Sequence, residues 1–410
     1  MSTYDLAVVG AGLGGLAAAA LFSAKGKKVL VSSPHASLAE ALGAVAADGF
    51  RFSSGPALLH GFEPGGAFNQ FFHAAGIHDW EPAHAAVYQV ALPDRRITVF
   101  SNQEETLDEL RREFPREIQS LIKFSRDLSK AAVLSAQNRV AAFIAKHWSS
   151  RAFIRNYKFS AELGAFLDVQ ARYFFQRPCN ELSLETLITL CTRKPAAITA
   201  GYGKLAERLA EVLHRRGGEI RLSEPSREIV FHGNRAKGIG TAQGVVDAGT
   251  VLLCSSEKSM PSLFLGIRDE VVPVGMERNV LYLPDYARPH DVLACSLSAK
   301  DDTSAAPEGM RTLVVTFHGS SDQLRDSGSR TDRLSGLVPF LDDFLVLTRD
   351  FRPSETAAAP PGLSLKPLQS RVRGPLLFKG SKGNVYLLHE ARHAPLQVIS
   401  AARKFVEKTA

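Results

Sequence analysis

A short strand, a glycine-rich turn and an alanine-rich helix open this sequence and constrain its fold more than any other feature. Residues 4–9 (YDLAVV) are apolar, the turn GAGLGG follows at 10–15, and LAAAALFSAKG then leads to a second apolar run at 29–31. Two apolar runs separated by a helical stretch predict a β-α-β unit. Gly26, just past the helix, is typical of a C-terminal cap. We therefore expect an α/β chain whose first unit is Rossmann-like.

The glycine spacing in this turn matches G-x-G-x-x-G, with which Rossmann folds bind dinucleotides. Gly10 permits the tight turn, Gly12 lets a pyrophosphate approach the backbone, and Gly15 lets helix and strand pack closely. The N–H groups and dipole at the helix start then bind phosphates without a cationic side chain. The predicted cofactor contacts in the turn are Gly10, Gly12, Leu13, Gly14 and Gly15. The competing interpretation is a glycine turn that serves packing alone.

The acidic residue that usually ends the second strand of such a unit is absent. A carboxylate about 20 residues after the glycines accepts the adenosine ribose hydroxyls, but here the strand ends Val31-Ser32-Ser33-Pro34. Ser33 can still hydrogen-bond a ribose hydroxyl, as a weaker, neutral acceptor. Lys27 and Lys28 precede the strand, so they do not indicate a site for a 2′-phosphate.

Composition narrows the class of protein. The chain has 410 residues, of which 45% are hydrophobic and 22% are charged. This composition is typical of a globular protein, and the length fits two or three structural units. Its net charge of +7 is compatible with phosphate-bearing ligands, nucleic acid, an anionic membrane face or a plain solvated surface. No nucleic-acid-binding motif accompanies the charge, so we expect no nucleic-acid partner.

Cysteine usage and the N-terminus favour a cytoplasmic protein. Four cysteines without C-x-x-C spacing indicate reduced thiols. No basic segment precedes the first apolar run, and no run of about 18 apolar residues occurs elsewhere. We expect neither a signal peptide nor a membrane span.

Helical patterns dominate the first half of the remaining chain and strand patterns the second. Helices are predicted at 104–130, with a restart at Pro115, across most of 139–192, and at 201–216. Strands are predicted at 219–222, 227–231, 245–254, within 271–294 and at 312–317. Residues 320–333 are interpreted as a surface loop and 357–362 as a break. This order predicts an α/β dinucleotide domain interrupted by a helical and strand-bearing insertion.

Three blocks of the sequence resemble the phytoene desaturase and carotenoid isomerase group of FAD-dependent, amine-oxidase-like flavoproteins. They are VVGAGLGGLAAAA near the start, DGFRFSSGPALL at 48–59, and GYGKLAERLAEVLHRRGGEIRL followed by SREIVFHGNRAKGIGT within 201–241. In that family the last block builds the adenine-side wall of the FAD domain. Segments 66–195 and 256–374 match the family only in pattern.

The resemblance implies a bi-lobed oxidoreductase of the desaturase or isomerase type with a lipophilic, isoprenoid or polyene substrate. It implies FAD as cofactor, NAD(P) being less expected, and chemistry that belongs largely to the flavin. The implied division is a discontinuous FAD-binding domain (1–65, 196–255 and 375–410) and an inserted α+β substrate or cap domain (66–195 and 256–374). No catalytic residue can be named.

Further cofactor contacts follow from the resemblance. Gly55 and Pro56 fall where the family's loop passes the flavin, although a simple strand-ending turn is the alternative. The backbone near Ser226 would contact the adenine, and Glu390 would lie by the ribityl chain. The departures are the family's Gly-Gly-Arg, which is unreadable after the second strand, and the C-terminal loop, where His389 replaces a glycine and several residues are missing. They motivate the alternative of a relative that has lost redox catalysis and serves as a binding or accessory protein.

The C-terminal segment also contains His389-Glu390-x-x-His393, the H-E-x-x-H signature of zinc peptidases. That signature requires a helix that points both imidazoles to one side. Here β-prone VYLL precedes it and Pro395 follows, so a shortened flavin motif is favoured over a zinc peptidase, and no metal is expected.

A basic and apolar stretch, RVAAFIAKHWSSRAFIRNYKF at 139–159, allows two interpretations. It is either an amphipathic helix in peripheral contact with a membrane surface or part of a lobe whose apolar face packs inward. The inward-packing interpretation is favoured. Phe71-Phe72 and Tyr173-Phe174-Phe175 are interpreted as core rather than substrate contacts, and His60 as structural.

Overall fold

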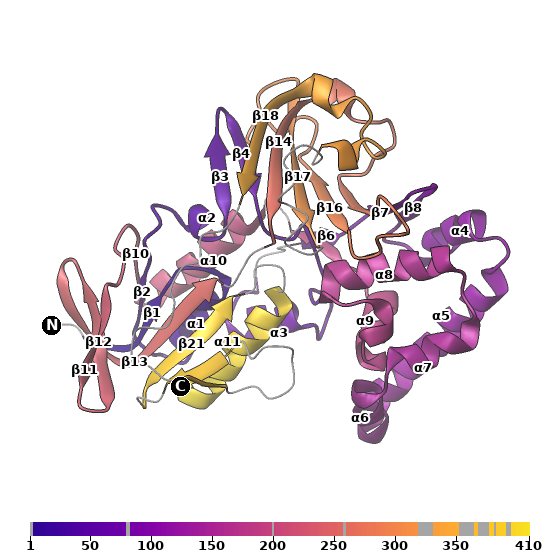
Figure 1. Ribbon diagram of the computed structural model, residues 1–410. Coiled ribbons are helices and arrows are strands. Elements are labelled where there is room, and N and C mark those ends of the chain that lie inside the picture. Colours follow the sequence, from indigo (N-terminus) through magenta and orange to yellow (C-terminus); the bar gives the residue numbers. More distant parts are fainter. Residues whose placement is uncertain are drawn as a thin grey trace.

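The computed structural model describes residues 3–78, 83–198, 201–256, 260–318, 331–351, 365–367, 377–380, 383–390 and 395–410. Two large β-sheets lie at different ends of the described part, and a group of helices extends from the second of them (Figure 1). No helix within these residues is long and apolar enough to cross a bilayer.

The first sheet is built around parallel strands from distant parts of the chain. Its order is β10-β2-β1-β13-β21, continued by the antiparallel β20 and β19. The bounds are β1 Tyr4–Val9, β2 Val29–Ser32, β10 Glu219–Arg221, β13 Gly244–Ser256, β19 Leu365–Pro367, β20 Leu377–Gly380 and β21 Val385–Glu390. The chain leaves β1 toward β2 on one side and reaches β13 on the other, so the strand order reverses at β1. Such a switch point is where open α/β sheets bind ligands, and the predicted Rossmann-like fold is confirmed.

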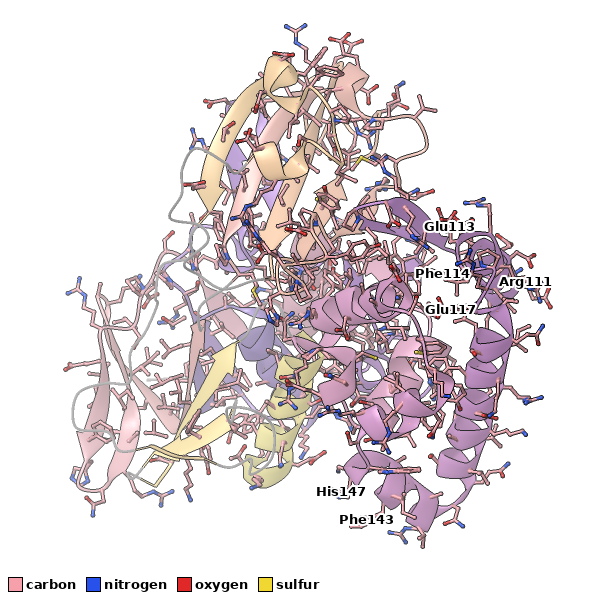
Figure 2. The ribbon with its side chains drawn as sticks, turned by 45° about the vertical axis from the view of Figure 1, so that its right-hand side comes forward. Arg111, Glu113, Phe114, Glu117, Phe143 and His147 are labelled. Carbon is pink, nitrogen blue, oxygen red and sulfur yellow. The ribbon has the colours of Figure 1, made fainter. Side chains whose placement is uncertain are left out.

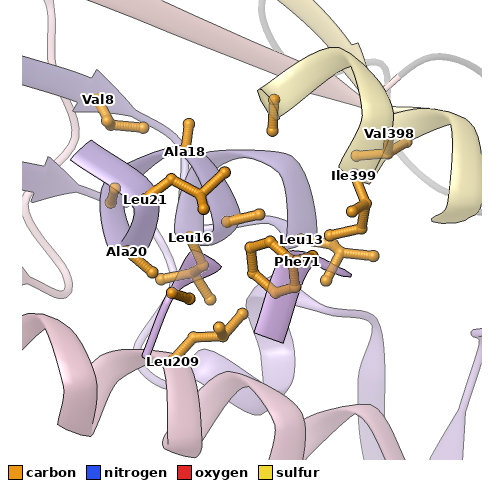
Figure 3. Packing of buried hydrophobic residues seen from close by; sticks show 14 of the residues in the cluster. Val8, Leu13, Leu16, Ala18, Ala20, Leu21, Phe71, Leu209, Val398 and Ile399 are labelled. Atoms are coloured by element: carbon orange, nitrogen blue, oxygen red, sulfur yellow. The ribbon is translucent and has the colours of Figure 1, made fainter. Parts of the chain in front are cut away.

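Helices cover one face of this sheet and a β-ribbon covers the other. The helices are α1 Leu13–Ala24, α3 Ala67–Ala74, α10 Gly201–Arg215 and α11 Pro395–Thr409; the ribbon is β11 Glu228–His232 with β12 Arg235–Thr241; α2 is Leu38–Ala41. Ala17, Ala18, Ala19 and Ala20 of α1 are completely buried because α10 and α11 both pack on it (Figure 3). Phe22 stacks on Phe405 of α11 with 6.0 Å between ring centroids. A helix that is apolar all round is a buried helix, as its composition predicts.

The second sheet is mostly antiparallel, in the order β18-β14-β17-β16-β15-β7-β8. Its strands are β7 Tyr88–Leu92, β8 Arg95–Val99, β14 Ser262–Arg268, β15 Asn279–Tyr282, β16 Leu293–Leu297, β17 Met310–Phe317 and β18 Leu345–Phe351. The hairpin β3 Ala44–Ala47 and β4 Phe50–Ser53 packs on it, where Phe52 stacks on Phe264 at 4.9 Å. A small sheet of β5 Leu58–Leu59, β9 Ala196–Ile198 and β6 Ala83–Ala85 joins this region to the first.

Six α-helices between β8 and β9 form the helical region. They are α4 Gln103–Glu113, α5 Ile118–Gln137, α6 Arg139–His147, α7 Ser150–Ile154, α8 Ala161–Phe175 and α9 Leu184–Thr192. The break predicted at Pro115 lies between α4 and α5. The inward-packing interpretation of 139–159 is wrong for its first part: the side chains of Val140, Phe143 and Trp148 are 66%, 65% and 49% exposed. Only Ala145 of α6 is buried there, because α6 lies at the end of the helical region and has neighbours on one side alone.

Two segments near residue 65, where a domain boundary was expected, pack on the other side of that boundary. Helix α3, expected in the cap, buries Phe68 and Phe71 in the same core as α1. The β3–β4 hairpin, expected in the FAD-binding domain, buries Phe50 and Phe52 against the second sheet. Both segments lie near the join between the sheets, where chain order is a poor guide to packing.

Candidate functional site

The glycine turn between β1 and α1 leaves no room for side chains at two of its positions. Gly10 has φ +108°, and a Cβ there would lie 2.8 Å from the Cys254 carbonyl oxygen of β13. A Cβ on Gly15 would lie 2.3 Å from the Gly10 carbonyl oxygen. The Gly10 N–H donates to the Ser32 carbonyl at 2.8 Å, which ties the turn to the end of β2. These glycines are required by close backbone packing at the switch point.

Gly12 is the N-cap of α1, with φ −69° and ψ 179°, and contributes no capping side chain. The first turn of a helix has N–H groups that the helix itself cannot bond. With no cap side chain in the way, these groups and the helix dipole fit a pyrophosphate. The donor set of the turn therefore fits the phosphates of a dinucleotide.

The predicted residues outside the turn lie after or at the ends of separate strands of the first sheet. Ser33 follows β2, and Glu390 ends β21 in register with Ser256 of β13, so both lie on the side from which the glycine turn emerges. Ser226 lies in the loop between β10 and β11. For His389 and Glu390 the structure describes the backbone alone, as strand, and His393 lies outside the described residues. A strand at His389 and Glu390 is not the helix that a zinc peptidase motif requires.

Ser33 is completely buried, and its hydroxyl accepts from the His35 N–H at 3.3 Å. Its backbone continues the ladder to β10, because the Ser33 N–H donates to the Arg221 carbonyl at 3.0 Å. The Ser33 carbonyl accepts from the Glu224 N–H at 2.9 Å. The ribose contact predicted for Ser33 stays a prediction.

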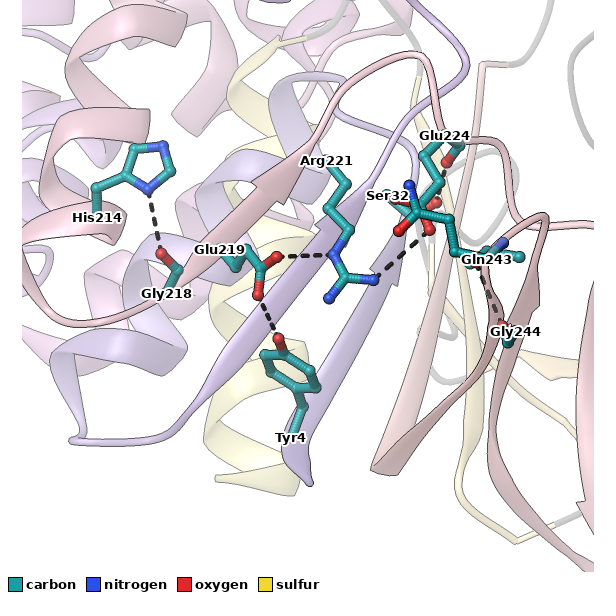
Figure 4. A network of polar contacts seen from close by, with 10 residues as sticks. Tyr4, Ser32, His214, Gly218, Glu219, Arg221, Glu224, Gln243 and Gly244 are labelled. Atoms are coloured by element: carbon teal, nitrogen blue, oxygen red, sulfur yellow. Dashed lines mark hydrogen bonds and ion pairs between the residues drawn. The ribbon is translucent and has the colours of Figure 1, made fainter. Parts of the chain in front are cut away.

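Glu224, whose N–H donates to the Ser33 carbonyl, is a buried carboxylate beside the end of β2. Its Oε1 lies 3.6 Å from Arg221 Nη1 and has no hydrogen-bond partner among the described residues (Figure 4). Arg221 also donates to Glu219 at 2.7 Å, which accepts from the Tyr4 hydroxyl as well. Arg221 first and Tyr4 second lower the pKa of Glu219. This network serves the β10–β2–β1 face of the sheet.

A small cavity lies between the loop at 54–58 and the second sheet. Gly55 closes tightly on Tyr202 of α10, because a Cβ there would lie 2.3 Å from the ring. From β17 and the residue that follows it, alternate positions reach the cavity, as strand geometry requires. Its lining includes Ser54, Gly55, Pro56, Tyr173, Asn279, Cys295, Ser296, Val314, Thr316 and His318. Gly55 and Pro56 thus line a cavity. A simple strand-ending turn, the alternative interpretation, would not require this.

His60 is 2% exposed, and neither ring nitrogen has a hydrogen-bond partner. It packs between Phe174 at 4.4 Å and Phe175 at 6.0 Å. Burial lowers the pKa of His60 to about 4, so the ring is neutral near pH 7.

A larger cavity lies among α4, α5, α8 and α9. Most of its lining is apolar, and Tyr88 is on its wall with the hydroxyl donating to Gln170 at 2.7 Å. Tyr88 also meets Phe174 edge-on at 6.3 Å, and Phe174 meets Tyr173 of the first cavity at 4.8 Å. A short aromatic wall therefore separates the two cavities.

Sequence reasoning missed most of the cavity lining. Asn279, Ser296 and Thr316 come from three strands of the second sheet and meet only through sheet pairing. The alternation of Val314, Thr316 and His318 was the one available signal, and it indicates a strand face rather than a site. Tyr173, interpreted as core, is indeed buried in the core of the helical region, and it also lines the first cavity. Phe71 and Phe72 are core, as expected.

Comparison with known proteins first defines the class. Residues 8–75 match the model of the NAD(P)-binding Rossmann-like domain. An oxidoreductase structure from Methanosarcina mazei superposes with a TM-score of 0.65 at 14% identity, covering 99% of this chain and 100% of that one. A Rab GDI structure from Plasmodium falciparum gives a TM-score of 0.63 at 10% identity, covering 98% and 96%. The protein has the fold of this dinucleotide-binding class.

Comparison of sequences points to a narrower group of similar proteins. Prolycopene isomerase of Daucus carota is 24% identical over 76% of this chain and 61% of its own length. A 4,4′-diapophytoene desaturase of Methylomonas is 22% identical over 62% of this chain and 54% of its own length. The sequence is therefore similar to those of carotenoid isomerases and desaturases, as its motifs indicated. It spans less than two thirds of the length of these relatives.

Proposed function

We propose that this protein is an FAD-dependent oxidoreductase of the desaturase or isomerase type, acting on a lipophilic isoprenoid or polyene substrate. The observation that carries the proposal is the glycine turn at the strand-order switch, where side chains at Gly10 and Gly15 would overlap the backbone. The relatives with isomerase and desaturase names support the reaction class. A bound flavin supplies the redox chemistry in such a protein.

The chain's own residues would hold and orient the two ligands. The first turn of α1, beginning after Gly12, would hold the pyrophosphate through backbone N–H groups. The end of β10 near Ser226 would form the adenine side, and the end of β21 at Glu390 the ribityl side. Segments 1–65, 196–255 and 375–410, without the β3–β4 hairpin that packs on the second sheet and with α3 added, would together form this cofactor unit.

Two cavities separated by an aromatic wall support a lipophilic substrate. The smaller one, lined by Gly55 and Pro56, is the proposed reaction chamber. The larger one among the helices would accept the remainder of a long apolar molecule, because most of its lining is apolar, as is typical of such sites. Peripheral contact with a membrane surface would give a substrate of this kind a route of entry.

Binding of FAD tests the proposal. We expect purified protein, stripped of any ligand, to bind FAD with a 1:1 endpoint in a fluorescence-quenching titration. Gly12→Asp should lose this binding, because an aspartate at an N-cap stabilises the helix while placing a negative charge where the phosphates bind. Gly164→Ala is the control, since Gly164 lies in α8 with nothing within 4 Å of its added Cβ. Folded protein that never binds FAD would favour the alternative, a relative that serves as a binding or accessory protein.

A further inference from the structure

The positive charge of this chain is concentrated in one part of it. No Asp or Glu occurs from Leu128 to Ala161, whereas that segment contains six Lys and Arg residues. The whole chain has 49 Lys and Arg against 42 Asp and Glu, so the rest has 43 against 42 and is almost neutral. The six cations are Lys130, Arg139, Lys146, Arg151, Arg155 and Lys158, all exposed.

Exposed apolar side chains gather in the same segment. Among the described residues ten large hydrophobic side chains are exposed, and six of them lie between Val133 and Trp148. On α6, Val140, Phe143 and Ile144 are spaced three and four residues apart and so share one face. Their exposed fractions are 66%, 65% and 50%, whereas Ala145 on the other side is buried at 3%.

The end of α5, α6 and the start of α7, residues 130–151, form a protruding tip, which we call the α6 tip. Phe143 and His147 lie at its end, away from both sheets (Figure 2). Asn138 joins α5 to α6 and caps α6, its Oδ1 accepting from the Val140 N–H at 2.8 Å. This cap stabilises the bend in the chain, so the apolar face of α6 is held outward by local structure.

No described acidic side chain neutralises the tip. None of its cations forms an ion pair with a described residue, whereas basic side chains elsewhere, such as Arg208 and Arg221, do. A neutral solvated surface needs neither the cations nor the apolar face. Cations around exposed Phe, Ile and Trp side chains are the combination that binds the interface of an anionic bilayer.

We propose that the α6 tip docks on an anionic phospholipid bilayer. Val140, Phe143 and Ile144 enter the headgroup and acyl boundary, while Lys146 and Arg151 contact lipid phosphates and carboxylates. A second copy of this chain is a poor occupant, because a two-fold contact would place the four positive charges of one tip against the four of the other. Leu128 of α5 lines the larger cavity, and Leu134 of the tip follows six residues later on the same helix. That separation is about 9 Å along the axis of α5.

Vesicle flotation of the full chain tests the docking, with or without a bound cofactor. The protein should float with phosphatidylcholine vesicles that contain phosphatidylserine and remain behind with phosphatidylcholine alone, and binding should weaken as salt rises. Lys146→Gln/Arg151→Gln should weaken binding roughly tenfold or more, from the contribution of each cation near an anionic surface. Phe143→Ser/Ile144→Ser should abolish flotation. Both pairs are exposed, so the variants should fold.

Matched variants distinguish the tip from the surface in general. Phe340→Ser removes an equally exposed Phe (76%) far along the chain, and Arg235→Gln/Lys379→Gln removes two exposed cations of the first sheet; neither should change flotation. With Trp80→Phe, Trp148 is the sole tryptophan, and its emission should shift to the blue on vesicles that contain phosphatidylserine.

Three results would overturn the docking proposal. The first is absence of flotation with both kinds of vesicle, and the second is binding that the tip variants leave unchanged. The third is a dimer in light scattering that Phe143→Ser/Ile144→Ser dissociates, which would assign the tip to a second copy. None of these three results depends on FAD binding, so the proposed function and the docking surface are tested separately.

Discussion

Single glycines decide whether the first unit can form, because their space is taken by backbone from other strands. Gly15 meets the Gly10 carbonyl, and Gly10 meets Cys254 of β13, so the turn is closed from two sides. Other glycines of the chain, such as Gly164, face open space. The G-x-G-x-x-G spacing could identify which glycines matter, since that pattern encodes the close approach.

Gly15→Ala and Gly164→Ala should therefore change stability in opposite directions. Gly15→Ala should destabilise the protein by about 1–3 kcal/mol, as overpacking does. Gly164→Ala should stabilise it by about 0.5–1 kcal/mol, because Ala loses less conformational entropy than Gly in a helix interior. Urea unfolding of both variants measures the difference. Equal effects would mean that the turn is not as closely packed as described.

The buried His60 predicts a pH dependence of stability. Its pKa is lowered from 6.5 to about 4 in the folded chain, so between these values the unfolded chain binds a proton that the folded chain does not. This contribution to the free energy of unfolding is fully present above about pH 6.5. It is lost as the pH is lowered toward 4, and the total loss is about 3 kcal/mol. His60→Phe, surrounded by Phe174 and Phe175, should remove this part of the acid sensitivity. The exposed His232→Gln should retain it; the same acid sensitivity in His60→Phe would contradict the account.

At the scale of elements, one side chain joins strands that the sequence places far apart. Asn384, just before β21, is buried at 7% and donates to the Ala236 and Gly249 carbonyls at 2.8 and 2.7 Å. Its Oδ1 accepts from the Ala236 N–H at 2.8 Å. These bonds connect β21 to β12 and β13.

Asn384→Ala should destabilise the protein by about 3 kcal/mol or more, since it leaves buried backbone groups of Ala236 and Gly249 without partners. Thermal or urea unfolding of the variant measures this loss. Asn156→Ala, at an exposed asparagine, should be near neutral. A near-neutral Asn384→Ala would show that water or a shift of β21 satisfies these groups.

Helices and strands could be predicted from the sequence where characteristic residues mark their boundaries. The βαβ unit, the helix at 201–215 and the break at Pro115 were predictable because turn glycines, a proline and helical periodicity mark them. The outward face of α6 was not, because an amphipathic pattern does not reveal whether a neighbour covers it. The role of Asn384 was hidden for a related reason: its partners at 236 and 249 are defined only by sheet pairing.

At the scale of the whole molecule, the last helix completes a core that the first residues begin. Val398, Ile399, Phe405 and Val406 of α11 are each at most 3% exposed and lie in the α1 core. Each contributes about 2 kcal/mol on burial, so together they contribute about 8 kcal/mol, comparable with the 5–15 kcal/mol that stabilises a typical protein.

A chain ending at residue 394 should therefore lose cooperative folding of the first unit. Limited proteolysis and circular dichroism would detect this loss. A chain ending at 408, which keeps all four apolar side chains, should behave as the full chain does. Cooperative unfolding of the shorter chain would show that α1 has enough cover without α11.

The visible absorption spectrum of the purified protein, reconstituted with FAD if it is colourless, tests the central claim most directly. We predict a yellow protein with an absorption band near about 450 nm that dithionite bleaches, as for a protein-bound flavin that accepts electrons. Correctly folded protein that retains no flavin after reconstitution and gel filtration would contradict the claim that the glycine turn serves an FAD-dependent reaction.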